Sequence, residues 1–321
     1  MRIAARTALA LVAVFASTAA LGQAFPNHPV KLISPFPPGG GSDVVARILA
    51  PKLLEATGQQ FVVENRTGAA GNVGADYVAK SPPDGYTLLV ANNTVVTNPA
   101  VAKSPFDVVK DFTPVALIGS TAVALAVHPA FPAKNVDELV KLARENPGKY
   151  SYSSCGNGTA MHLAGELFKQ LAKVDIVHIA YRGCGPAIVD GVGGQVPILF
   201  NTITNTAPQA KGGKLRILAL ASPTRSPVDK ALPVIAESAG FEGFDADIWF
   251  GILAPAGTPP DVVQKLNAEI GRALGSQEVQ DRLAAQLFAI QTATPAAFGD
   301  LIKRDLARWS KLVKEAGIKG D

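Results

Sequence analysis

The first part of the chain alternates short apolar runs with longer amphipathic segments. The apolar runs predict buried strands at residues 30–35, 61–64 and 87–91. The amphipathic segments predict one helix over 42–56 and a second helix that ends near Ala79. On the first helix, the apolar side consists of Val45, Ile48, Leu49 and Leu53. Strands that alternate with helices are typical of parallel β–α–β units, so this pattern predicts an α/β fold.

A second set of the same kind begins after His128 and Pro129. Its apolar runs predict strands at residues 150–153, 176–179, 196–200 and 215–221. Helices are predicted over 136–144 and 161–171, and again after the glycine-rich turn near Gly183. Two such sets in a chain of 321 residues indicate two lobes, each with its own core.

The C-terminal part returns to helical periodicity. A turn rich in proline and glycine leads to Asp261, after which Val263, Leu266 and Ile270 form an apolar stripe. The stripe of the last helix consists of Phe298, Leu301, Ile302, Leu306, Trp309 and Val313. We expect these helices to cover the first lobe and Trp309 to be a packing residue.

The N-terminus predicts where the protein works. It opens MRIAAR, with two arginines and no acid, and continues with an uncharged apolar run from Thr7 to Leu21. Gly22-Gln23-Ala24 then supplies small residues at the positions that a signal peptidase reads. The apolar run is shorter than the ~20 residues of a spanning helix. Residues 1–24 are therefore predicted to be a secretory signal peptide, and the mature protein, from about Phe25, is expected outside the cytoplasm.

The net charge and the few histidines and cysteines limit which partners and bound groups are expected. The formal net charge of +4 falls to +2 without Arg2 and Arg6, and no Lys/Arg run exceeds two residues, so no nucleic-acid partner is expected. The four histidines lack a metal-ligand spacing and the two cysteines do not form C-x-x-C, so neither a metal nor a cofactor is expected. Cys155 and Cys184 are expected to form a disulfide after export.

Two glycine-rich turns between a strand and a helix are the candidate ligand sites. PFPPGGGSD ends at a helix start near Ser42, and SSCGNGT ends at a helix start near Thr159. Ligands of parallel α/β sheets bind beyond the carboxyl ends of the strands, and helix N-termini favour anions. Two such turns in one cleft would suit a carboxylate, with hydroxyl donors from Ser42, Ser154 and Thr159 and a cationic fork from Arg182. The alternative is that the glycines only make tight turns and the hydroxyls only cap helices.

Two other chemistries fit the residues less well. NRTGAAGNVG has its glycines at 68, 71 and 74, which is not the dinucleotide pattern G-x-G-x-x-G, so a tight turn is favoured there. An exported hydrolase would need Cys155 as a free thiolate near His162 or His178, or a serine in a G-x-S-x-G elbow, which the chain lacks. An enzyme is therefore the less favoured alternative.

Several long segments in a fixed order carry a family resemblance. They are PVKLISPFPPGGGSDVVAR, VVENRTGAAGNVGADYVAKSPPDGYTLL, VKDFTPVALIG, YSSCGNGTAMHLAGELF, VHIAYRGCGPAIVDGVGGQV and WFGILAPAGTPPDVVQKLN. The chain resembles the Bug family, the extracytoplasmic solute-binding proteins of tripartite tricarboxylate transporters. The resemblance implies a type II periplasmic binding protein with two α/β lobes, each a mostly parallel sheet flanked by helices, and a ligand cleft between them. It also implies a non-enzymatic protein that captures a small organic acid by lobe closure.

The resemblance further implies boundaries, partners and contacts. The first lobe would comprise residues 25–121 and 250–321, and the second lobe residues 122–249. The partners would be a large and a small membrane subunit of the transporter, and a monomer suits such a shuttle. Asp43 is expected to be a first-turn helix residue and not a ligand contact. The resemblance implies that the first turn and bridging waters hold one carboxylate of the ligand. The implied ligand contacts are Phe36, Pro37, Gly39, Gly40, Ser42, Asn92 and Asn93 in the first lobe and Ser154, Cys155, Gly156, Thr159, His162, Tyr181, Arg182 and Asn201 in the second.

The chain departs from the family pattern at several of these positions. Pro38 stands where a small residue is usual, so the first turn should be stiffer. Asn201 stands where the family often has an aspartate, which should disfavour ligands that carry an amine. Cys155 and Cys184 replace small or hydroxyl residues at neighbouring turns, and a bridge between them would stiffen the second-lobe half of the cleft. Because some members of the family serve sensing, a ligand-loaded partner of a signalling receptor is a second possible role.

Overall fold

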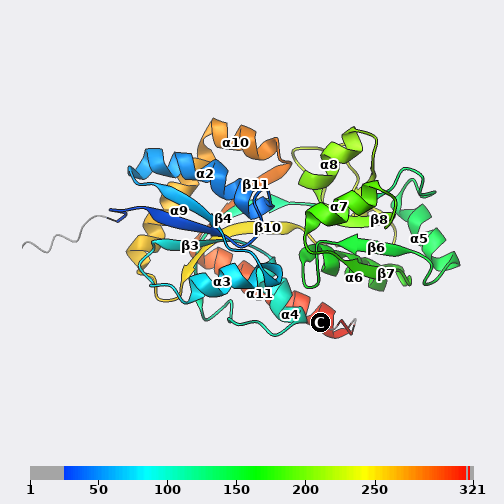
Figure 1. The fold of residues 1–321 in the computed structure, drawn as a ribbon, viewed down its shortest axis with the longest axis horizontal. Coiled ribbons are helices and arrows are strands. Elements are labelled where there is room, and N and C mark those ends of the chain that lie inside the picture. Colours follow the sequence, from blue (N-terminus) through cyan, green and yellow to red (C-terminus); the bar gives the residue numbers. More distant parts are fainter. Residues whose placement is uncertain (1–24, 316, 319–321) are drawn as a thin grey trace, which may run out of the picture.

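Two lobes, each built on one β-sheet, lie side by side in the computed structural model (Figure 1). The structure describes residues 25–315, 317 and 318, and the predicted signal peptide, residues 1–24, lies outside them. None of the helices in this described part has the length and apolarity that a membrane crossing requires.

The first sheet has the strand order β11-β4-β10-β3-β1-β2. Strand β1 pairs in parallel with β2 and β3, whereas β10 runs antiparallel to both β3 and β4. The sheet is central because its strands consist largely of buried side chains, as the apolar runs predict. Its strands are β1 (Val30–Ser34), β2 (Phe61–Asn65), β3 (Thr87–Asn92), β4 (Phe112–Thr121), β10 (Ile248–Pro255) and β11 (Phe288–Ala293).

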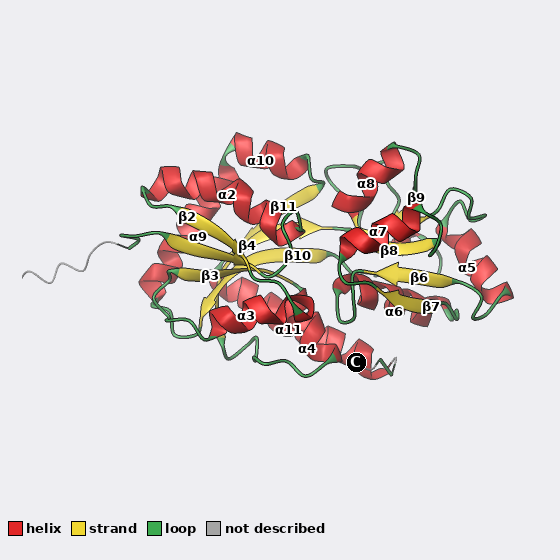
Figure 2. Ribbon diagram, in the orientation of Figure 1, coloured by secondary structure: helices red, strands yellow, loops and turns green. Residues whose placement is uncertain are grey.

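Helices cover both faces of the first sheet. Helices α2 and α10 lie on one side and α3, α4 and α11 on the other, while α9 contacts both α2 and β4 (Figure 2). The C-terminal helices therefore belong to the first lobe, and the indole of Trp309 on α11 is 1% exposed, as expected of a packing residue. The bounds are α2 (Gly41–Thr57), η1 (Ala69–Gly71), α3 (Asn72–Ala79), α4 (Thr94–Val101), α9 (Pro260–Gly275), α10 (Gln277–Ala284) and α11 (Pro295–Glu315).

The second sheet has the order β7-β6-β8-β5-β9. Helix α6 lies on one of its faces and α7 and α8 on the other (Figure 2). Its strands are β5 (Val123–Val127), β6 (Ser151–Ser154), β7 (Val177–Ala180), β8 (Ile198–Thr202) and β9 (Arg216–Leu220). Its helices are α5 (Val136–Glu145), α6 (Ala160–Ala172), α7 (Cys184–Val192) and α8 (Ile203–Lys211), with the short η2 (Ile235–Glu237) before the chain returns.

The chain passes between the sheets at two places. Strand β4 of the first sheet leads through Ala122 directly into β5 of the second, and the return passes through Ala246 and Asp247 into β10. The two crossings run side by side, because Ile248 pairs with Thr121. Ala221, which follows β9, bridges them, because its N–H donates to the Val123 carbonyl at 2.7 Å and its carbonyl accepts from the Ala246 N–H at 2.8 Å. The predicted lobe boundaries remain a proposal, and since β10 joins the first sheet from Ile248 we now propose the second boundary at that residue.

One feature of the predicted fold is wrong. The sheets are mixed and not mostly parallel, because β4, β5 and β10 run antiparallel to their main neighbours. The physical reason is that a strand that crosses from one sheet to the other cannot also follow the strand–helix–strand pattern that makes neighbours parallel.

Candidate ligand-binding site

The ends of several strands converge where the lobes meet. Phe250 pairs with Asn92, so the carboxyl end of β3 lies beside the start of β10, and Val123 pairs with Thr202, so the carboxyl end of β8 lies beside the start of β5. Only Ala122 separates β4 of the first sheet from β5 of the second. The carboxyl ends of β3 and β8 therefore face each other where the lobes meet. We call this place the interlobe seam, formed by residues 34–43, 92–98, 154–159, 181–184, 201–203, 221–222 and 246–247.

The first predicted turn is held in shape by Asp43. Its carboxylate, 2% exposed, accepts hydrogen bonds from the Gly39 N–H at 2.9 Å, from Arg47 Nε at 3.0 Å and from Asn65 Nδ2 at 2.9 Å. Burial alone would raise the pKa of Asp43, but these hydrogen bonds outweigh it and lower the pKa below its ordinary value. Asp43 thus builds the turn, and it lies in the first turn of α2 as expected.

The hydroxyl of Ser42 lies at the start of α2 without a protein partner. No side chain caps this helix at Gly40, and Ser42 Oγ is fully buried with no hydrogen bond. The preceding Gly41 brings the backbone against the ring of Phe250, where an added Cβ would lie 2.6 Å from the ring. The helix therefore begins with uncapped N–H groups and an orphaned hydroxyl.

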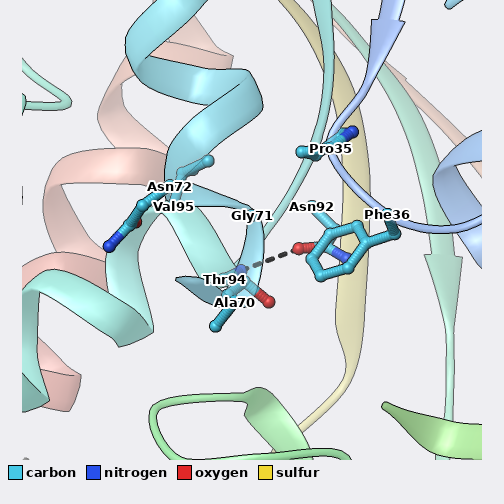
Figure 3. A pocket seen from close by; sticks show the side chains of 8 residues that line it. All are labelled: Pro35, Phe36, Ala70, Gly71, Asn72, Asn92, Thr94 and Val95. Atoms are coloured by element: carbon cyan, nitrogen blue, oxygen red, sulfur yellow. Dashed lines mark hydrogen bonds between the residues drawn. The ribbon is translucent and has the colours of Figure 1, made fainter. Parts of the chain in front are cut away.

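Phe36 and Asn92 line a small hollow beside this turn (Figure 3). The ring of Phe36 faces the backbone of Gly71, and the amide oxygen of Asn92 accepts a hydrogen bond from the Thr94 N–H at 2.9 Å. The residues that line it are Pro35, Phe36, Ala70, Gly71, Asn72, Asn92, Thr94 and Val95. Ala69 and Ala70 have φ values of 45° and 51°, so the NRTGAAGNVG segment is a strained turn against the hollow and opens α3 without a dinucleotide pattern.

Asn93 ties the first lobe to the second crossing. Its Nδ2 donates to the backbone carbonyl of Asp247 at 2.9 Å, and its Oδ1 is buried without a partner. This residue follows β3 and precedes α4, so it lies at the seam, and its role as a ligand contact stays a prediction.

The second predicted turn is organised by its own hydroxyls. Ser154 Oγ lies 2.7 Å from His178 Nε2 and accepts a hydrogen bond from the Gly156 N–H at 3.2 Å. Thr159 caps α6, because its Oγ1 accepts from the His162 N–H at 3.4 Å and donates to the Gly156 carbonyl at 2.7 Å. The helix-capping alternative is therefore confirmed for Thr159, whereas Ser42 makes no cap.

His162 and His178 form a stacked pair below this turn. Their ring centroids are 4.0 Å apart at 8°, and Nδ1 of His162 accepts from the Gly158 N–H at 3.2 Å. Burial, with a smaller contribution from Lys169, lowers the pKa of His162 to about 4, so this ring is neutral and able to accept. His162 is 5% exposed and supports the turn from within the lobe.

The predicted disulfide joins the two turns of the second lobe. Cys155 and Cys184 are bonded, with Cα atoms 4.3 Å apart. Asn201, fully buried, donates from Nδ2 to the Cys184 carbonyl at 3.1 Å, and its Oδ1 accepts from the Thr202 N–H at 2.8 Å. An aspartate at position 201 could not donate that first hydrogen bond, so the amide here holds the disulfide turn in place.

Tyr181 and Arg182, the last two predicted contacts, differ in whether another side chain already binds them. The phenol of Tyr181 donates to Asp190 Oδ2 at 2.6 Å, and burial together with Asp190 raises its pKa to about 12. Arg182 is exposed, and among the described residues no carboxylate forms an ion pair with it. The guanidinium is thus available to meet a ligand carboxylate.

The lobes touch through α4 and the second turn. Thr97 Oγ1 donates to the Gly158 carbonyl at 2.6 Å, and both groups are buried. Gly158 has a φ of 73°, and an added Cβ would lie 3.1 Å from Asn98 Nδ2 and 3.2 Å from its Cα. The sequence did not predict this contact.

The structure thus brings the predicted residues of both lobes to one seam, but it gives them different tasks. Ser42, Asn92 and Asn93 line the first-lobe side with Phe36, Pro37, Gly39 and Gly40, and Ser154, Cys155, Gly156, Thr159, Tyr181 and Arg182 belong to the two second-lobe turns. His162 and Asn201 lie beneath those turns. Sequence reasoning missed Thr97, Ser222 and Asp247, which reach the seam only through the fold. In the described part of the chain, no cluster of three or more His, Cys, Asp or Glu side chains is arranged to hold a metal ion.

Comparisons with known proteins agree with this architecture. Residues 45–318 match the model of the tripartite tricarboxylate transporter family receptor. Protein BugT of Bordetella pertussis is 36% identical over 319 residues, covering 97% of this chain and 98% of BugT. Among solved structures, R. palustris Rpa4515 with adipate has a TM-score of 0.86 at 34% identity, covering 92% of this chain and 99% of that one. MatC from Rhodopseudomonas palustris with bound malate has a TM-score of 0.81 at 33% identity, covering 90% and 100%.

These matches span both lobes. A family model that covers most of the chain, together with full-length relatives above 30% identity, establishes the family. The chain therefore belongs to the tripartite tricarboxylate transporter receptors of the Bug type, and its two α/β lobes have the periplasmic binding protein fold.

Proposed function

We propose that this protein captures a small carboxylate in the interlobe seam and presents it to the membrane subunits of a tripartite tricarboxylate-type transporter. The observation that carries the proposal is the orphaned hydroxyl of Ser42 at the uncapped start of α2. A buried hydroxyl without a hydrogen bond costs about 1–3 kcal/mol. A carboxylate at this helix N-terminus would accept from the hydroxyl and from the backbone N–H groups together.

The second lobe offers complementary groups across the seam. Helix α6 begins at the second turn, and each helix N-terminus contributes about 0.3–1 kcal/mol toward a nearby anion at an exposed site. The exposed guanidinium of Arg182 can bind a second carboxylate bidentately. Adipate in Rpa4515 and malate in MatC support a dicarboxylate as the class of ligand.

The first test is ligand binding by the protein without residues 1–24, after it has been denatured and refolded to remove a carried-over ligand. A panel of organic acids that includes adipate and malate is screened by thermal shift. A ligand at a hundredfold excess over its Kd stabilises the native state by about 2.7 kcal/mol. Absence of a shift with every acid, from protein shown to be folded, would refute the proposal.

A matched pair of variants then tests the site. Ser42→Ala removes the orphaned hydroxyl, and loss of a hydrogen bond to a charged group should weaken binding by roughly tenfold to a hundredfold. Ser153→Ala is the control, because Ser153 Oγ is also buried without a partner but precedes the seam by one residue on β6. Equal loss in both variants would mean that the effect is one of folding and not of ligand contact.

We propose that the two lobes close around the ligand and that the protein is a monomer. The hydrogen bond between Thr97 and the Gly158 carbonyl supports this proposal, because it joins α4 of the first lobe to the second-lobe turn. Small-angle scattering with and without the acid found by the panel measures both points. A radius of gyration that does not fall on binding, or a molecular mass of a dimer, would contradict them.

An enzymatic role is disfavoured by the state of its nucleophiles. Cys155 is in a disulfide and cannot be a thiolate. Ser154 does lie within hydrogen-bond distance of His178, but its hydroxyl is fully buried and accepts from its own turn. We expect no hydrolysis of activated esters above the rate of a Ser154→Ala variant.

Deletion of the gene should abolish uptake of the bound acid, whereas intact uptake with a lost transcriptional response would support the sensing role.

A further inference from the structure

The second crossing brings a carboxyl group to the seam. Asp247 directly precedes β10, and because Phe250 pairs with Asn92, Asp247 lies beyond the carboxyl end of β3. Its backbone carbonyl accepts from Asn93 Nδ2 at 2.9 Å. Its side chain is partly exposed although Asn93 and Ser222 beside it are buried. The second crossing thus places a partly exposed, carboxyl-bearing residue at the seam.

Two neighbours of this carboxyl group are neutral and two are charged. Ser222 Oγ, which follows β9, donates a hydrogen bond to Asp247 Oδ1, and this occupies one of the two carboxyl oxygens. Asn93, from the first lobe, carries no charge. The remaining neighbours are charged, namely Asp245 on the same segment and Arg308 on α11.

The positive charge of Arg308 is already shared. It contacts Asp245 Oδ2 at 3.1 Å and Asp305 Oδ1 at 3.3 Å, and Asp305 also accepts from Trp249 Nε1 at 2.7 Å. Two carboxylates thus take up the guanidinium, and Asp247 makes no ion pair with it. An ionised Asp247 would stand at the seam without a direct counter-charge among the described residues.

We propose that Asp247 sets the charge preference of the ligand site: its neutral carboxyl group admits a carboxylate ligand, and its ionised form repels one. The inference rests on the proposed function, since it concerns the same seam. The neutral carboxyl group offers an O–H donor to the ligand in addition to the hydroxyl of Ser42. The ionised group has only acceptors, so a ligand carboxylate would face a like charge.

The protonation equilibrium of Asp247 falls in the relevant range of pH. Burial raises its pKa from the ordinary 3.8 to about 7, and Asp245 adds to this rise, while the hydrogen bond from Ser222 and the charge of Arg308 oppose it. A ligand that binds only the protonated form therefore loses about tenfold in affinity between pH 6 and pH 8. Adipate and malate are mostly dianions already at pH 6, so their own titration over this range is small. In a site for a dianion it would raise the affinity with pH, which is opposite to the effect of Asp247.

Isothermal titration with malate and adipate at pH 6, 7 and 8 tests the inference. In Asp247→Asn the side chain stays neutral and its amide oxygen can still accept from Ser222, so the affinity should be constant within twofold over this range. A pH dependence that persists in Asp247→Asn would overturn the inference and leave the proposed function intact. If the panel identifies a different acid, that acid is titrated in their place. Absence of binding by every acid of the panel at all three pH values would overturn both.

Two further variants keep the test decisive if Asp247→Asn does not fold. Ser222→Ala removes the hydrogen bond that lowers the pKa of Asp247, so the midpoint of the pH dependence should move to higher pH. Asp245→Asn removes a neighbouring negative charge, so the midpoint should move to lower pH. Shifts in these opposite directions support the inference, and an unmoved midpoint in both variants overturns it.

Discussion

Removal of the disulfide between Cys155 and Cys184 should destabilise one lobe selectively. The bond closes a loop with a sequence separation of 29, and the chain-entropy relation for that length gives about 3.6 kcal/mol of stabilisation. At roughly 2–4 °C per kcal/mol, the melting temperature of the transition that contains the loop should fall by roughly 7–14 °C. Alanine replaces both cysteines in the variant, so that no polar group is buried at Cys155, which is 8% exposed.

Differential scanning calorimetry supplies the readout and an internal control. The closed loop lies wholly within the second lobe, between β6 and α7. If the lobes unfold in separate transitions, only one of them should move. Reductant should lower the melting temperature of the unmodified protein toward that of Cys155→Ala/Cys184→Ala and should leave the variant unchanged.

The outcome that refutes this reasoning is equally specific. A fall of less than about 2 °C would mean that the unfolded second lobe is already restricted without the bond, so that loop closure contributes little. A shift of both transitions would mean that the bond acts through contacts between the lobes, and an effect of reductant on the variant would point to a cause other than the disulfide.

Three further outcomes follow from the seam. Thr97→Val leaves the buried Gly158 carbonyl without its donor, which should cost about 1–3 kcal/mol in the closed state and be measured as weaker ligand binding at unchanged stability of the separate lobes. Gly158→Ala puts a Cβ against Asn98 at a φ of 73°, so it should weaken binding as well, by at least about 1 kcal/mol, in the same titration. Because its native pKa is raised from 3.8 to about 7, Asp247 contributes stability below pH 4 that is lost as the pH rises through 7, by as much as ~4 kcal/mol. Urea unfolding at pH 5 and pH 8 should therefore find Asp247→Asn increasingly more stable than the unmodified protein as the pH rises, and an equal difference at both values would contradict that sign.

The strand–turn–helix units were predictable because each carries a local signal. The strand predicted at 87–91 is found at Thr87–Asn92, and the helix predicted at 161–171 is found at Ala160–Ala172. Strands β4, β5 and β10 were not predicted. They are buried along nearly their whole length, so they lack the alternation of polar and apolar residues that marks a surface strand. The mixed character of the sheets was missed for the same reason.

The candidate site likewise contains residues that a local sequence signal predicts and residues that only the fold brings together. Glycine-rich turns at strand ends identified Ser42 and the turn that begins at Ser154 without any knowledge of the fold. Asp247 and Ser222 are brought together by a return crossing, and no spacing in the sequence connects them to Asn93. The partner of Asn201 was equally out of reach, because a hydrogen bond to the Cys184 carbonyl depends on the backbone of a distant turn.

The hydrogen-bonded pair of crossings limits how the lobes can be arranged before any ligand arrives. Ala221 bonds to Val123 on one side and to Ala246 on the other, so three segments form one narrow ribbon between the lobes. A ribbon of this kind bends and twists about one region, whereas two independent tethers would allow each lobe to tumble separately. We therefore expect the unliganded protein to sample few relative orientations of its lobes. The entropy lost when a small acid fixes those orientations is correspondingly small, which leaves more of the contact energy for affinity.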